Sequence, residues 1–154
     1  MQEEGDVFAP NQHITALAFD AEGSRIAVGN TQGSIISIRL NKKGSDRYKL
    51  IVPFADRKAH IHINALAFGG NGKQMWSLES DIYDAKGQTV LKLLEDRYHA
   101  KPIITTKVDQ ADDVWSDSWV ILTDKQDCVL RLYKNSDSPG AENSYTVQAD
   151  YIYQ

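Results

Sequence analysis

The side chains that could ligate a metal are few in this chain. Two of its four histidines, His60 and His62, stand two residues apart, so on a strand their side chains would share one face. With His99 they would offer the imidazole nitrogens that zinc binds. The plainer interpretation, which we favour, places these histidines in polar segments that precede strands. We therefore predict no metal site and no cofactor.

The sequence gives equally little evidence for a calcium site, a reactive cysteine or a catalytic motif. The acidic segment 109–113, followed by Asp117, lacks the residue order and the distal glutamate of the known calcium loop, so we interpret it as a solvated turn. The one cysteine, Cys128, excludes an intramolecular disulfide and is interpreted as a small strand residue rather than a nucleophile. Nucleophile elbows, phosphate-binding glycine loops and plausible Cys–His pairs are missing. The sequence predicts no catalytic residues and a protein that is not an enzyme.

Charge and hydropathy exclude two further classes of partner. The 17 basic and 21 acidic residues give a formal net charge of -4, which argues against a general phosphate-backbone binder and predicts no nucleic-acid partner. No apolar run approaches the roughly 18 residues of a membrane span. The acidic start of the chain lacks the build of a signal peptide. We therefore predict a cytoplasmic protein without membrane contact.

A repeated motif predicts the elements that would position any functional site. The segment 13–19, with the letters HITALAF, returns as HINALAF at 62–68, and a weaker round follows His99. Short apolar runs separated by polar, glycine-containing turns predict antiparallel meanders. The spacing is 49 residues from Ile14 to Ile63 and 40 from Ile63 to Ile103. Such periods are typical of propellers, solenoids or arrays.

Each round is predicted to contain four strands. They are expected over 14–19, 25–29, 34–40 and 48–52, then 63–68, 74–78, a stunted 82–84 and 89–94, and then 103–108, 119–123, 129–133 and 145–149. The spacing of Leu91, Leu94 and Tyr98 also fits a helix over 90–98, but the repeat favours a strand.

These residues resemble the WD-repeat family of β-propellers. In the first round, the strand 15–19, the turn Glu22-Gly23, the strand 26–30 and the segment 32–34 match the family pattern in order. Ile38-Arg39 stands where the family has Trp-Asp. The second round keeps Asn71-Gly72 and ends on 82–84, and the third keeps 129–134, with tyrosine for tryptophan in both. No round has the full Trp-Asp ending.

The resemblance implies an all-β fold, a partial WD-type β-propeller of about three four-stranded antiparallel blades. We predict a single domain over 1–154 with repeats at approximately 13–53, 62–94 and 99–154. Propellers close with about four to eight blades, so three blades leave two apolar faces open to water. The segment 6–9 would suit the outer strand of a neighbouring blade. A non-propeller barrel or sandwich is the alternative fold.

The functional prediction follows from the expected number of blades, because three blades are too few to close a propeller ring. We predict a non-catalytic protein-interaction scaffold, completed by self-association or by another polypeptide that supplies further blades. Two copies would give a ring of about six blades. The alternatives are a regulatory or sensor propeller domain of a larger signalling protein and, less favoured, a propeller-based hydrolase.

The resemblance also implies which loops bind partners, namely those from the fourth strand to the next blade and from the second strand to the third. The residues predicted there are Arg57, Lys58, His60, Glu79, Asp81, Arg97, Tyr98, Lys101, Asp124 and Lys125. Of Trp115 and Trp119, one is expected to anchor the core, and Trp115 is predicted to be an exposed partner contact. Tyr151 and Tyr153 share a strand face, which suits either packing or strand addition by a partner.

Overall fold

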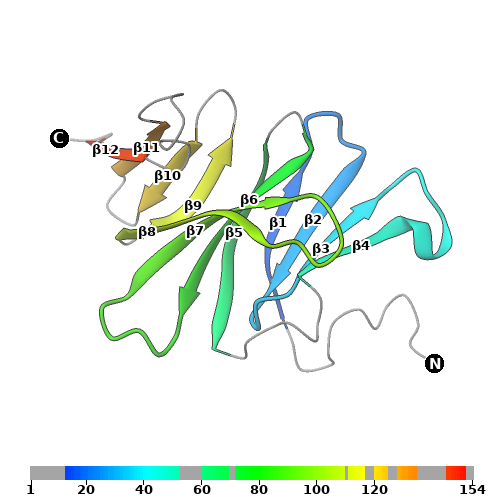
Figure 1. Ribbon diagram of the computed structural model, residues 1–154, viewed down its shortest axis with the longest axis horizontal. Helices are drawn as coiled ribbons and strands as arrows, with labels where there is room; N and C mark the ends of the chain where they lie inside the picture. Colours follow the sequence, from blue (N-terminus) through cyan, green and yellow to red (C-terminus); the bar gives the residue numbers. More distant parts are fainter. Residues whose placement is uncertain are drawn as a thin grey trace.

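The computed structural model describes residues 13–52, 60–69, 72–109, 111–116, 120–124, 128–134 and 145–151. Its strands form three four-stranded antiparallel sheets, each built from four strands consecutive in the chain (Figure 1). The first contains β1 (Ile14–Phe19), β2 (Arg25–Asn30), β3 (Ile35–Arg39) and β4 (Tyr48–Val52), with the short 3-10 helix η2 (Gly44–Arg47) before β4. The second contains β5 (Ile61–Gly69), β6 (Gln74–Asp81), β7 (Gln88–Glu95) and β8 (Pro102–Asp109). The third contains β9 (Ala111–Ser116), β10 (Val120–Asp124), β11 (Cys128–Lys134) and β12 (Tyr145–Tyr151). The prediction of an all-β fold of four-stranded blades is confirmed.

The turns that join these strands follow from local chemistry. Between β1 and β2 the carboxylate of Asp20 accepts hydrogen bonds from the backbone N–H groups of Ser24 (2.8 Å) and Arg25 (3.1 Å). Gly23 supplies the positive φ, 71°, that this turn needs. The described residues contain no helix that is long and apolar enough to cross a membrane.

The boundaries of the second and third repeats differ from the prediction. The segment predicted to open the third round is β8, which pairs with β7 as the fourth strand of the second sheet. The third sheet begins at β9, which includes residues 111–113, so the interpretation of the acidic segment 109–113 as a solvated turn is wrong. Residues 82–84, predicted as a stunted strand, form a turn between β6 and β7. The strand alternative for the segment around Leu91 is confirmed, because β7 covers it.

The physical reason for this shift is the composition of β9. It reads ADDVWS, and Ala111 and Val114 are its buried hydrophobic residues, so its apolar alternation is weak. The more strongly apolar run around Ile103 was therefore predicted to be the first strand of the third round. The sequence period alone cannot say which strand of a four-stranded unit a given apolar run occupies.

The sheets pack face to face, and the second lies between the other two (Figure 1). The first strands of the three sheets are neighbours, because β5 contacts both β1 and β9. The core between the first and second sheets contains Ala16, Ala27, Ile35, Ile51, Ile63, Leu66, Met75 and Leu94. The core on the other side of the second sheet contains Ala65, Ala67, Trp76, Leu78, Leu91, Leu93, Ile104, Val108, Ala111, Val114 and Leu122. The second sheet is apolar on both faces for this reason.

Candidate functional site

The first sheet has one apolar face that faces away from the second sheet. The register pairs Leu17 with Val28 and Phe19 with Ile26, and paired residues lie on the same side of a sheet. Continuing the register across β3 and β4 gives the residues of this face, which we call the open face because its β1 edge is exposed: Leu17, Phe19, Ile26, Val28, Ile36, Ile38, Tyr48 and Leu50. Val28 and Ile36 in the middle of the face are each 5% exposed. Within the described ranges, the extensive contacts of the first sheet with other sheets are all with β5.

Equivalent residues in the two copies of the repeated motif differ in how exposed they are. Leu17 and Leu66 occupy the same position of the two motif copies, but Leu17 is 62% exposed and Leu66 is 5% exposed. Leu66 is buried because the first sheet packs against it. Phe19 is 63% exposed, whereas Phe68, its equivalent, packs against the same core. The open face is therefore equivalent to the surface through which the second sheet binds its neighbour, but no neighbouring sheet covers it within the described part of the chain.

A large aromatic side chain is also exposed at the other end of the stack. Val114 on β9 is buried toward the second sheet, so its neighbour Trp115 points to the opposite side of the third sheet. Trp115 is 50% exposed, as predicted, while its role in partner contact stays a prediction. Trp119 and Tyr153 lie outside the described residues, as does the segment 6–9.

The connection between β6 and β7 carries a second exposed cluster. The imidazole Nδ1 of His60 lies 2.9 Å from a carboxylate oxygen of Asp81, and the ring of His60 stacks on Tyr83 at 5.2 Å between centroids. Asp81 also accepts the backbone N–H of Tyr83 at 2.9 Å. Tyr83 is 78% exposed, so most of its side chain remains available to a partner while its ring stacks on His60. The structure thus places the predicted site residues His60 and Asp81 next to Tyr83, which was predicted to lie in a strand.

Other predicted site residues lie elsewhere. Arg97, Tyr98 and Lys101 belong to the connection from β7 to β8 within one sheet, so their predicted place in a link between blades is wrong. The error follows from the shifted strand assignment. Glu79 is 7% exposed and pairs with Lys92 at 3.0 Å. Arg57, Lys58 and Lys125 lie outside the described residues, and Asp124 ends β10 with a side chain that is not described.

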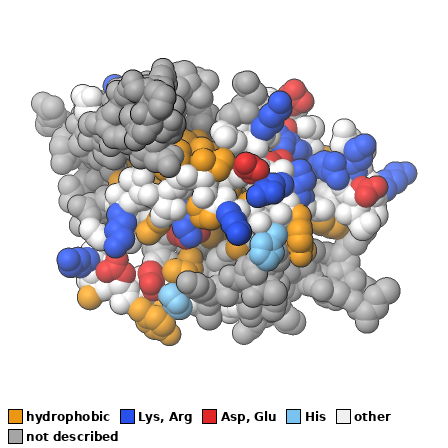
Figure 2. All heavy atoms as spheres, viewed as in Figure 1, with side chains coloured by type: hydrophobic (Ala, Val, Ile, Leu, Met, Phe, Trp, Pro, Cys, Tyr) orange, Lys and Arg blue, Asp and Glu red, His pale blue; other side chains and the backbone are white. Residues whose placement is uncertain are grey.

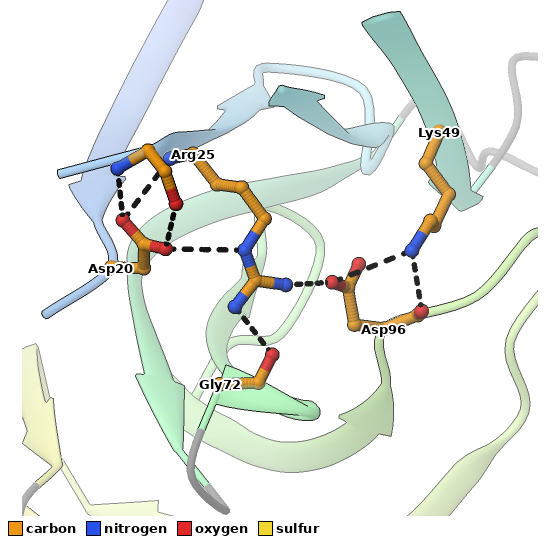
Figure 3. Close-up of polar contacts among 6 residues, drawn as sticks. Asp20, Arg25, Lys49, Gly72 and Asp96 are labelled. Atoms are coloured by element: carbon orange, nitrogen blue, oxygen red, sulfur yellow. Dashed lines mark hydrogen bonds and ion pairs between the residues drawn. The ribbon is translucent and has the colours of Figure 1, made fainter. Parts of the chain in front are cut away.

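Sequence reasoning missed the ionic network that joins the first two sheets (Figure 3). The guanidinium of Arg25 contacts the carboxylates of Asp20 (3.2 Å) and Asp96, and it donates to the carbonyl oxygen of Gly72 at 2.6 Å. Its guanidinium also lies 4.7 Å from the centroid of the Phe68 ring. Lys49 contacts Asp96 from the other side at 3.5 Å. No local motif indicates this network, because Arg25 and Asp96 are 71 residues apart.

This network predicts an acid-sensitive stability. Burial raises the pKa of Asp20, but the hydrogen bonds that its carboxylate accepts from Arg25 and Ser24 outweigh this and lower the pKa from 3.8 to about 2. The stabilisation by ionised Asp20 is therefore complete above 3.8 and is lost as the pH falls through about 2. Asp20→Asn should lower the urea midpoint most at neutral pH and least below about 2. A difference from wild type that stays constant across this range would contradict the assignment.

The described residues gather no metal-binding cluster. Among them, no group of three or more His, Cys, Asp or Glu side chains is placed to hold a metal ion. A hollow of about 470 Å³ lies where the inner strands meet, and Thr15, Asn64, Asp112 and Asp113 contribute polar groups to it. What the arrangement offers instead is contact surface.

Comparison with known proteins supports the propeller architecture. No protein-family model matches this chain, and no curated protein matches it. Among solved structures, the β-propeller domain of Cps50 (Swd1) from Myceliophteria thermophila superposes with a TM-score of 0.53 at 14% sequence identity. The match covers 89% of this chain and 37% of that one. The chain therefore has a propeller-like fold and spans well under half the length of that propeller.

Proposed function

We propose that this chain is a non-catalytic protein-interaction scaffold, a partial propeller of WD type whose open face is covered by a further blade. A second copy of the chain or another polypeptide supplies that blade. The observation that carries the proposal is the contrast between Leu17 and Leu66, which share a motif position but differ in exposure, 62% against 5%. An apolar sheet face of this kind marks an interface.

The energetics of the open face favour such an interface. Burying a leucine or phenylalanine side chain stabilises a complex by about 1.5–3 kcal/mol. Leu17 and Phe19 together would thus contribute a factor of about 100 or more to the association constant. A blade is the natural occupant because the equivalent face of the second sheet already binds one.

The proposal predicts that charges on the open face will separate the assembly. Leu17→Lys combined with Phe19→Lys should leave the domain folded, because both side chains are mostly exposed, but should weaken association by about 100-fold. The measurement is the particle mass, by sedimentation velocity, of the tagged chain recovered from the cells that make it.

A control uses an exposed apolar pair outside the open face. Ile82→Lys combined with Ile103→Lys changes side chains that are 55% and 39% exposed, in the turn after β6 and on β8. This control should leave the particle mass unchanged. A wild-type particle with the mass of one chain, or an equal loss in both double variants, would refute the assignment of the open face.

A further inference from the structure

A crevice of about 290 Å³ lies between the first and second sheets, apart from the open face. Its apolar wall includes Val52 at the end of β4, Ile61 at the start of β5 and Leu94 on β7. Its polar groups come from Glu79, Lys92 and Lys101. Figure 2 shows one face of the molecule on which Lys and Arg side chains lie beside apolar ones. The crevice combines an apolar wall and ammonium groups in a small volume.

The connection from β7 to β8 shapes the crevice. The backbone N–H groups of His99 and Ala100 donate to the carbonyl oxygens of Leu50 (3.0 Å) and Ile51 (2.9 Å) on β4. His99 has a φ of 57°, which a non-glycine residue adopts only where its surroundings hold it. The connection is therefore attached to the outer strand of the first sheet, and this attachment positions the neighbouring Lys101.

The charges of the crevice do not balance. The side chain of Glu79 is only 9% exposed, and its carboxylate lies 3.0 Å from Nζ of Lys92. The two charges of this pair cancel. Lys101 is exposed and forms no ion pair with any residue in the described ranges. Among the described residues that line the crevice, one ammonium group is thus in excess beside an apolar wall. Such a site favours an anion that also carries an apolar group.

We propose that the crevice binds the C-terminal residue of a protein partner, with its carboxylate on Lys101 and its apolar side chain against Leu94 and Ile61. A C-terminal apolar residue joins both chemical features within one residue. The volume lies near the lower end of the about 300–1,000 Å³ of ligand sites, which suits one residue and not a long segment. Capture of a terminal carboxylate is a known mode of peptide recognition. This inference rests on the proposed function, because it assigns one contact to a protein partner.

The test is an NMR titration of the whole chain, with the backbone amides of Leu94 and Lys101 as reporters. The probes are the tetrapeptide Gly-Ser-Ala-Leu with a free carboxylate, the same peptide as its C-terminal amide, and N-acetylleucine. A hydrogen bond to a charged group is worth about 1.5–3 kcal/mol, so the amide should bind about tenfold to 100-fold more weakly than the acid. Lys101→Gln should weaken binding of the acid by a similar factor.

Lys86→Gln is the matched control, because Lys86 is exposed in the turn after β6 and lies outside the crevice. It should leave binding of the acid unchanged. Equal binding of acid and amide, no effect of Lys101→Gln, or no binding of the acid at millimolar concentration would overturn the inference. N-acetylleucine carries the same terminal residue and should bind within about tenfold of the peptide. Much weaker binding of N-acetylleucine would overturn the assignment to a single terminal residue. The titration uses short peptides and reads only the crevice, so the proposed function is tested separately by the particle mass.

Discussion

Gly29→Ala is expected to lower the free energy of unfolding by about 3 kcal/mol, the upper range for overpacking a core. Gly29 lies on β2 and faces β5 of the second sheet. An ideal Cβ at this position would lie 2.7 Å from Cβ of Ile63 and still closer to its Cγ2. Ile63 is fully buried, and its Cβ cannot swing away by rotating a side-chain torsion. The two sheets would have to separate locally to admit one methyl group.

Gly44→Ala is the control for this substitution. Unlike Gly29, Gly44 has a positive φ, 65°, and no atom lies within 4 Å of its ideal Cβ. The cost there is the backbone strain alone, about 1–2 kcal/mol. Urea unfolding of both variants measures the difference. If Gly29→Ala costs no more than Gly44→Ala, the close approach of the first and second sheets is wrong.

Arg25→Met is expected to lower the free energy of unfolding by about 3 kcal/mol, because it leaves two buried carboxylates without their shared cation. The side chains of Asp20 and Asp96 are 5% and 3% exposed. Methionine preserves much of the packing on Phe68, so the loss reports mainly on charge. Lys49 still neutralises Asp96 in part, which places the expected value at the lower end of the range for broken buried pairs.

Arg97→Met makes the same chemical change at an exposed pair. Arg97 and its partner Glu95 are 61% and 51% exposed, and such pairs contribute about 0–1 kcal/mol. Thermal or urea unfolding should therefore show a large shift for Arg25→Met and almost none for Arg97→Met. Equal shifts would show that the network of Arg25 does not hold the two sheets together.

The repeated motif predicted the inner strands well. Segment 13–19 is β1 with one preceding residue, and segment 62–68 lies within β5; the two strands are neighbours in the sheet stack. This prediction worked because both copies alternate with apolar residues on both faces, which is typical of strands between packed sheets. The shared letters cannot, however, reveal that Leu17 is exposed and Leu66 is buried. That difference depends on whether another sheet lies against the strand.

The candidate sites were harder to predict from the sequence, because they also depend on contacts between distant segments. The pairing of His60 with Asp81 depends on a register between β5 and β6 that the repeat pattern does favour. Glu79 and Lys101 come together only because the connection after β7 bends back to β4, and no sequence rule fixes that path. The weak pattern of β9 misplaced the boundary between the second and third sheets, whereas the later predicted strands 119–123, 129–133 and 145–149 lie close to β10, β11 and β12. Long-range packing, not local propensity, decided these features.

The most direct test of the central claim measures whether Leu17 is covered in the cell. On a chain carrying Cys128→Ser, Leu17→Cys is labelled with a membrane-permeant maleimide, in intact cells and after dilution of the purified chain. Lys86→Cys serves as an exposed reference. If a further blade covers the open face, Leu17→Cys should react about tenfold or more slowly in cells than in dilute solution, an occupancy of the covered state worth about 1.4 kcal/mol. The reference should react alike in both. Equal reactivity of Leu17→Cys in the two settings would show that the open face remains exposed and would contradict the account.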